Sequence, residues 1–190
     1  MQRQAALTLA DLVLPRRGLL ARGAAVLAGT LLIALSAQVA VPFAPVPLTG
    51  QTFAVLLVAA LLGRRLGAAT MIAYLAEGAA GLPVFSAWTG GAARLAGPTG
   101  GYLLAFVPAA WIVGALCERG WDRRFGTAAL AMAAGNTVIL LGGVAWLAVF
   151  TGAESAVALG AVPFLAGDLV KIVFAALALP AGWRIFGRNG

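Results

Sequence analysis

The sequence contains no histidine and a single cysteine, Cys117, in 190 residues. The absence of histidine excludes histidine general acid–base catalysis, histidine metal ligands and histidine-dependent catalytic triads. One cysteine excludes an intrachain disulfide, and we expect Cys117 to be a buried, inert thiol. The sequence also lacks a GxxxxGK[ST] phosphate-binding loop and a GxSxG elbow, so we predict a protein that is not an enzyme and has no ATPase site of its own.

Charged residues are also scarce. They make up 10% of the chain, against about 25% in an average soluble domain. Hydrophobic residues make up 62%, and the mean hydropathy is +0.99. A chain this apolar cannot cover its surface with polar groups, so the bilayer is the expected solvent. The net charge of +7 lies in short clusters between apolar runs, which does not indicate nucleic-acid binding.

The apolar runs predict an all-α, polytopic membrane protein with six transmembrane helices. A spanning helix needs about 20 apolar residues, so the second run is read as a tilted or partly buried half-span. The first run, 19–41, is too long for the apolar region of a signal peptide. We expect an N-terminal arm (1–18), one membrane domain (19–186) and a short tail (187–190), with spans near 19–40, 52–62, 66–80, 102–117, 125–150 and 163–183.

Arginine placement predicts the orientation of these spans. With six spans, 11 of the 13 basic residues fall on the same side of the membrane. Cytoplasmic loops are enriched in basic residues, so both termini are expected to be cytoplasmic. The connections near 41–51, 81–101 and 151–162 then lie outside, and the ligand site is expected beneath them. The 11 residues are Arg3, Arg16, Arg17, Arg22, Arg64, Arg65, Arg119, Arg123, Arg124, Arg184 and Arg188.

Asp168 and Lys171 form the clearest candidate site. Their i, i+3 spacing places them on the same face of the last predicted span. Charged residues inside a spanning helix are costly and usually serve a function. They are interpreted either as a polar clamp, with Asp168 accepting a ligand N–H and Lys171 donating to an oxygen, or as a self-neutralising pair that packs helices together.

Other candidates come from the outer connections and span ends. Arg94 suits recognition of a carboxylate, or is a solvated loop residue or a partner of Glu77 or Glu154. Gln51 and Thr49 either contact a ligand or cap the helix that follows. The aromatic residues either pack on an apolar ligand or form an interfacial belt, and Asn136 is best explained by an interhelical hydrogen bond. The aromatic candidates are Phe85, Trp88 and Tyr102.

Small residues recur at four-residue spacing in the first predicted span. Such rows allow helices to approach closely. The contact is either within the chain or with a partner membrane subunit. The two rows are Ala21, Ala25 and Gly29, and Ala24 and Ala28.

Four segments of the sequence form a joint pattern: VPLTGQTF (46–53), GLPVF (81–85), GPTGGY (97–102) and PFLAGDLVK (163–171). Together they resemble the BioY family, the biotin-specific S components of energy-coupling factor (ECF) transporters. Their order and six-span setting match that family over residues 20–185. Ala166 stands where the last motif often has proline, which changes no polar group.

The resemblance implies an S-component fold that captures biotin with high affinity at an outer pocket of the cytoplasmic membrane. Biotin would be the transported substrate, and no cofactor is implied. Asp168 and Lys171 match the family's polar ligand contacts, while Arg94 lies in a loop that varies. The implied partners are membrane lipids, a transmembrane coupling subunit and two ATPases, although some members act without that module; self-association stays open.

Alternative functions are an S component for another vitamin, a membrane-embedded enzyme and a structural assembly subunit. The enzyme alternative lacks an evident nucleophile–base pair.

Overall fold

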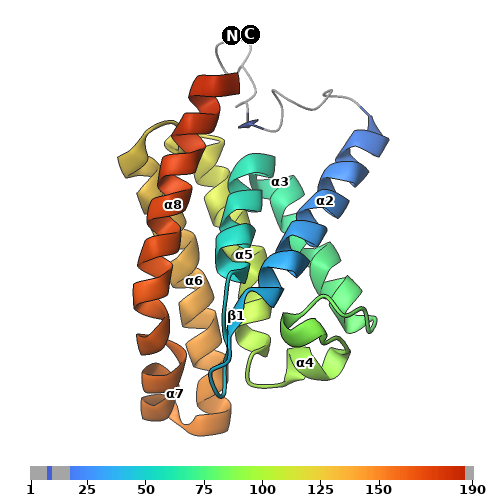
Figure 1. The fold of residues 1–190 in the computed structure, drawn as a ribbon, viewed down its shortest axis with the longest axis vertical. Coiled ribbons are helices and arrows are strands. Elements are labelled where there is room, and N and C mark those ends of the chain that lie inside the picture. Colours follow the sequence, from blue (N-terminus) through green and yellow to red (C-terminus); the bar gives the residue numbers. More distant parts are fainter. Residues whose placement is uncertain (1–7, 10–17, 187–190) are drawn as a thin grey trace.

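The computed structural model describes residues 8–9 and 18–186. The predicted N-terminal arm lies largely outside these residues, and so does the predicted tail. The described chain is a bundle of long helices with a short antiparallel hairpin and two small helices at one end (Figure 1). The long helices are α2 (Leu19–Gln38), α3 (Gln51–Ala79), α5 (Gly100–Cys117), α6 (Phe125–Thr151) and α8 (Val162–Phe186).

Five stretches of the described chain are long and apolar enough to cross a membrane, and one of them, α3, is interrupted near its middle. Gly63 interrupts α3 with φ 77° and ψ 177°, a conformation that residues with a Cβ rarely adopt. The two halves fold back on each other, since Gln51 hydrogen-bonds Tyr74, 23 residues along the chain. In a straight helix those residues would be about 34 Å apart. The structure therefore confirms an all-α polytopic fold, and the two halves of α3 bring its long apolar helical segments to six.

The first half of α3 is short because the chain before it is not helical. Residues 51–62 extend about 18 Å at the usual helical rise, against a hydrocarbon thickness of about 30 Å. The preceding segment carries the hairpin of β1 (Ala40–Val41) and β2 (Leu48–Thr49). Backbone of this kind is tolerated at membrane depth where it is shielded or lines a cavity. Thr49 is not the helix N-cap, which is Gly50, but its hydroxyl accepts the Gln51 N–H.

The connection expected near 151–162 contains a helix. Residues Ala153–Gly160 form α7, a short helix between α6 and α8. Its sequence, AESAVALG, is rich in good helix formers, but at two turns it is too short to appear as a span. The 81–101 connection also contains local structure, namely η1 (Ser86–Trp88) and α4 (Ala92–Ala96). Figure 1 shows α4 and α7 at the end of the bundle opposite the start of α2.

The small residues of α2 divide between two environments. Ala25 and Gly29 are buried within the chain, and a Cβ on Gly29 would lie 2.7 Å from Cγ2 of Thr70 in α3. This is the intramolecular packing that the sequence left open. Ala24 and Ala28 are exposed, and Ala21 is half-buried, so contact of these residues with a partner subunit stays a prediction.

Candidate ligand-binding site

A cavity of about 440 Å³ lies beneath the non-helical segments. Its volume falls within the range of about 300–1,000 Å³ that is typical of small-molecule sites. Its wall comes from the end of α2, the β1–β2 hairpin, the start of α3, the 85–89 turn, α4, α5, α6 and α8. The cavity brings together five of the six candidate substrate-binding residues: Gln51, Trp88, Arg94, Tyr102 and Asp168.

Asp168 is the buried anionic group of this cavity. Its side chain is 3% exposed, and each of its two oxygens already accepts one hydrogen bond. Oδ1 lies 3.1 Å from Nζ of Lys171, and Oδ2 lies 3.0 Å from Nδ2 of Asn136 in α6. A carboxylate has about four acceptor positions, so Asp168 retains capacity for donors from a ligand. The interhelical hydrogen bond predicted for Asn136 is confirmed.

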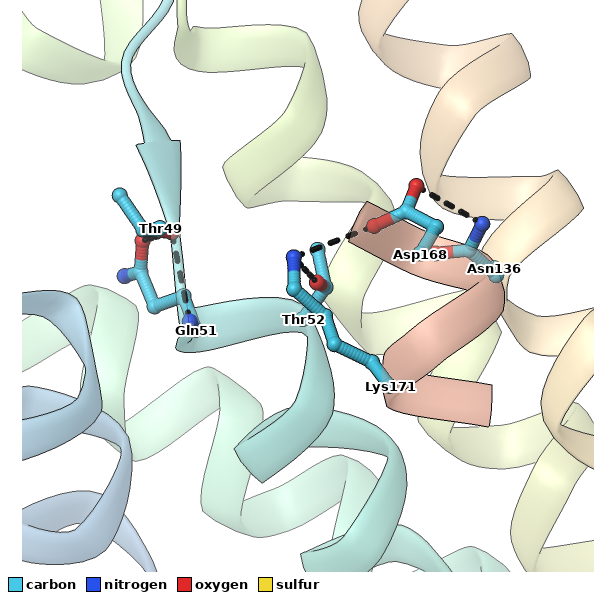
Figure 2. Close-up of polar contacts among 6 residues, drawn as sticks. All are labelled: Thr49, Gln51, Thr52, Asn136, Asp168 and Lys171. Atoms are coloured by element: carbon cyan, nitrogen blue, oxygen red, sulfur yellow. Dashed lines mark hydrogen bonds and ion pairs between the residues drawn. The ribbon is translucent and has the colours of Figure 1, made fainter. Parts of the chain in front are cut away.

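Lys171 does not form part of the cavity wall, although it belongs to the same polar cluster. Figure 2 shows its ammonium between Thr52 and Asp168, and Nζ lies 2.9 Å from Oγ1 of Thr52. A row of hydrogen bonds thus links Thr52, Lys171, Asp168 and Asn136, and it connects α3, α8 and α6. Lys171 balances the charge of Asp168 without lining the cavity itself, and its direct contact with a ligand stays a prediction.

Arg94 lies at the exposed rim of the cavity, in α4. Among the residues that the structure describes, it forms no ion pair with Glu77 or Glu154, the two partners considered for it from the sequence. Its guanidinium therefore offers planar, paired donors at the mouth of the site. Asp168 and Arg94 place opposite charges at the wall and at the rim.

Gln51 is buried at the first turn of α3 and is held by two neighbours. Its Nε2 donates to the Tyr74 hydroxyl, which in turn donates to the Val84 carbonyl at 2.9 Å. Its Oε1 lies 3.4 Å from Oγ1 of Thr49. Figure 2 shows Thr49 and Gln51 side by side at the start of α3. The amide nitrogen keeps a second N–H and the amide oxygen a second lone pair, so Gln51 can still offer a donor and an acceptor to a ligand.

The aromatic candidates differ in how firmly they are held. Tyr102 is buried, donates its hydroxyl to the Gly160 carbonyl at 2.7 Å, and stacks on Phe164 with ring centroids 5.9 Å apart. Phe85 is buried edge-on to Tyr74. Trp88 lines the cavity but is 62% exposed. The sequence did not single out Gln38 or Tyr74, because each is an ordinary residue in an apolar helix, and it marked Phe164 only as part of the segment PFLAGDLVK.

Other chemistry is sparse in the described part of the chain. Within residues 8–9 and 18–186, no group of three or more carboxylates and cysteines lies close enough together to hold a metal ion. Cys117 is buried, as expected. The cavity therefore offers one carboxylate, one guanidinium, neutral hydrogen-bonding groups and aromatic surface, which suits binding of a small molecule that is polar at two ends.

The chain is similar to a family of known proteins. A model of the BioY family matches residues 4–188. The probable biotin transporter BioY of Pyrococcus horikoshii is 42% identical over 146 residues, which cover 77% of this chain and 86% of that protein. The biotin transporter BioY of Thermotoga maritima is 40% identical over 149 residues, covering 78% and 87%.

A solved structure shares the fold. The crystal structure of an S-component for biotin from an ECF-type ABC transporter matches with a TM-score of 0.70 and 24% identity. The match covers 85% of this chain and 90% of that one.

Proposed function

The chain belongs to the BioY family, and from that premise we propose that it captures biotin and takes it across the cytoplasmic membrane as the substrate-binding subunit of a transporter. The chain covers most of the length of relatives named biotin transporters. The single observation that carries the proposal is Asp168, a buried carboxylate in the wall of an otherwise largely neutral cavity.

The chemistry of biotin complements the cavity. Its ureido group has two N–H donors, its ring and chain are apolar, and its tail ends in a carboxylate. We infer that Asp168 accepts a ureido N–H and that the aromatic wall packs on the ring. The free guanidinium of Arg94 at the rim then pairs with the carboxylate. This orientation places the anionic end of biotin away from Asp168, where like charges would repel.

Equilibrium binding of radiolabelled biotin to the purified protein tests the proposal. Asp168→Asn should weaken binding by about 10- to 150-fold, since a hydrogen bond to a charged group contributes roughly 1.5–3 kcal/mol. Arg124→Gln, which changes an exposed arginine of the connection between α5 and α6, is the matched control. Parent protein that binds another vitamin but not biotin would contradict the proposal.

The orientation of biotin is tested with its amide, which lacks the carboxylate. The parent should prefer biotin over biotinamide, and Arg94→Gln should lose that preference while still binding biotinamide as the parent does. An equal loss of affinity for both ligands would mean that Arg94 does not meet the carboxylate.

We also propose that the end of the bundle at which α2 begins faces the cytoplasm. The arginines near helix ends cluster there, while Arg94 and Glu154 lie at the end that holds the cavity. A reporter that is active only in the cytoplasm, fused after residue 190, should be active; activity of a periplasmic reporter would contradict this orientation. The proposed partners are a transmembrane coupling subunit and two ATPases at that face. The cytoplasmic-end arginines within the described residues are Arg22, Arg64, Arg65, Arg119, Arg123, Arg124 and Arg184.

A further inference from the structure

The last residue of α2, Gln38, connects that helix to a turn in the cavity wall. Its Nε2 donates to the carbonyl of Phe85 at 3.1 Å and to that of Ala34 in its own helix at 3.0 Å. Its Oε1 accepts the backbone N–H of Trp88 at 3.0 Å. Both ends of one amide thus hold a segment that lies about 50 positions further along the chain, and a carboxylate or an apolar side chain could not make the same set of bonds.

The turn that Gln38 holds, residues 85–89, has an unusual backbone. Phe85 and Thr89 pair across it, with the Phe85 N–H donating to the Thr89 carbonyl at 2.9 Å. Between them, Ala87 and Trp88 are both left-handed, with φ 57° and 54°. Residues with a Cβ rarely adopt this conformation, and two in succession require support from their surroundings. The contacts from Gln38 reach Phe85, which precedes these two residues, and Trp88, the second of them.

The base of the same loop is anchored without Gln38. The Tyr74 hydroxyl donates to the Val84 carbonyl, and the buried Phe85 ring packs edge-on to Tyr74 with centroids 5.6 Å apart. The Gly91 N–H donates to the Gly78 carbonyl at 2.7 Å. These contacts fasten both ends of the loop to α3. Loss of the Gln38 amide should therefore release the tip, residues 86–89, and leave the base and the helical bundle in place.

We propose that Gln38 is a positioning residue that latches the 86–89 tip over the cavity, so that opening of the tip controls how fast a ligand leaves. Gln38 and all four tip residues line the cavity, and Trp88 at the tip is exposed at its outer side. The side chain of Gln38 forms its hydrogen bonds with other groups of the protein, so its role is to hold the 86–89 tip in place and not to bind the ligand. The identity of the ligand as biotin rests on the proposed function; the latch itself does not.

The latch is tested first without any ligand. Ser86→Cys places a half-buried reporter in the tip, and its labelling by a membrane-impermeant maleimide reports opening. Adding Gln38→Leu should speed labelling about 10-fold, because the tip loses two neutral hydrogen bonds. Gln38→Glu keeps an acceptor for Trp88 but loses the donor to Phe85, so it should give a smaller increase. The chain without Ser86→Cys is the blank, since Cys117 is buried.

Ser36→Ala is the matched control, because Ser36 lies in the same last turn and its side chain bonds only to Leu32 of its own helix. Labelling in this variant should equal that of the Ser86→Cys parent. Equal labelling rates in the Gln38→Leu and Ser36→Ala backgrounds would overturn the proposal.

Ligand kinetics and a rescue complete the test. Gln38→Leu should raise the dissociation rate of radiolabelled biotin about 10-fold, with a smaller change in association and an unchanged melting temperature. Ala87→Gly in the Gln38→Leu background should slow dissociation again, because glycine adopts positive φ without steric cost. Faster labelling in Gln38→Leu with no biotin binding by the parent would support the latch and refute the proposed ligand. Parent-like labelling and dissociation in Gln38→Leu would refute the latch alone.

Discussion

Two buried aspartates lie near the two ends of α8, and their surroundings differ. Asp168 belongs to the helix near its start, and Asp122 lies outside the helix and accepts a hydrogen bond from Trp183 near its end. Asp168 has a cation on one oxygen and an amide on the other. Asp122 lies in η2 (Trp121–Arg123), with Oδ2 accepting the Trp183 indole N–H at 2.6 Å. Among the described residues its Oδ1 has no hydrogen-bond partner. The nearby cation, Arg123, lies over the Trp183 ring at 4.7 Å instead of pairing with the carboxylate.

The difference separates a carboxylate prepared for a ligand from one that serves the fold. Lys171 supplies Asp168 with a counter-charge at 3.1 Å, and the carboxylate lines the cavity, where it can accept N–H donors. Among the described residues Asp122 forms no ion pair, and it lies outside the spans. Burial raises the pKa of Asp122, and the Trp183 hydrogen bond and the Arg123 charge lower it by less. Asp122 thus joins the α5–α6 connection to the end of α8 as a hydrogen-bonding group.

Removing the counter-charge of Asp168 should have the largest effect. Lys171→Met leaves a carboxylate in an apolar span with only Asn136 beside it, and breaking a buried pair costs about 3–5 kcal/mol. Denaturant unfolding in detergent would measure the loss. Lys171→Met combined with Asp168→Leu should recover most of the stability but not biotin binding. A double variant that binds biotin as the parent does would show that the pair only packs helices.

The neutral partner of Asp168 should matter less. Asn136→Leu removes the hydrogen bond to Oδ2, and we expect a loss of about 2 kcal/mol in the free energy of unfolding, as for a hydrogen bond to a charged group. Biotin affinity should fall as well, because the carboxylate is no longer held in place. Thr137→Val on the next position of α6 is the control, since Thr137 is exposed and bonds only to Ala133. Equal effects of the two changes would exclude a positioning role for Asn136.

The sequence indicated the role of Asp168 but not that of Asp122. Apolar run lengths and arginine clusters predicted the six passes, and the charges of Asp168 and Lys171 stood out because charge is rare in a span. Asp122 lies among arginines in a connection, where an acidic residue is unremarkable. Its burial depends on Trp183, 61 positions away, and no local pattern specifies such a pair.

The same reason explains what was missed around the cavity. The position of the cavity followed from the proline- and glycine-rich connections, but the partners of its polar residues come from distant segments. Gln38 meets Trp88 across 50 positions, and Gln51 meets Tyr74 only because Gly63 reverses the chain. Glycine at 63 could equally have ended the helix, and only the packing of the two halves of α3 shows the hairpin.

Weakening the other aspartate through its single partner should cost less than either change at Asp168. Trp183→Phe keeps an aromatic ring beneath Arg123 but removes the side-chain donor to Oδ2 of Asp122. We expect a loss of about 1.5 kcal/mol at pH 7, within the range for an unmade buried hydrogen bond. The melting temperature in detergent should fall by about 3–6 °C for a chain of this size. Biotin affinity should be unchanged, and a parallel loss of affinity would show that this end of α8 is coupled to the cavity.

The smallest effect, and the one with a distinctive pH signature, is expected from Asp122→Asn. The variant keeps an oxygen that accepts from Trp183 and removes the carboxylate charge. Because burial raises the pKa of Asp122, the native state holds the proton to higher pH than the unfolded chain, whose aspartate pKa is about 3.9. The stability from Asp122 is therefore present below that value and is lost as pH rises through the folded pKa.

At pH 7 the variant should match the parent or melt up to about 4 °C higher, a gain of roughly 1 kcal/mol. Near pH 4 the two proteins should converge. The melting-temperature difference between variant and parent, followed from pH 4 to pH 8, isolates this group from the other titrating residues. A parent that is the more stable protein at pH 7 and loses that advantage on acidification would show that Asp122 is held as a stabilised anion, which would make the two aspartates alike.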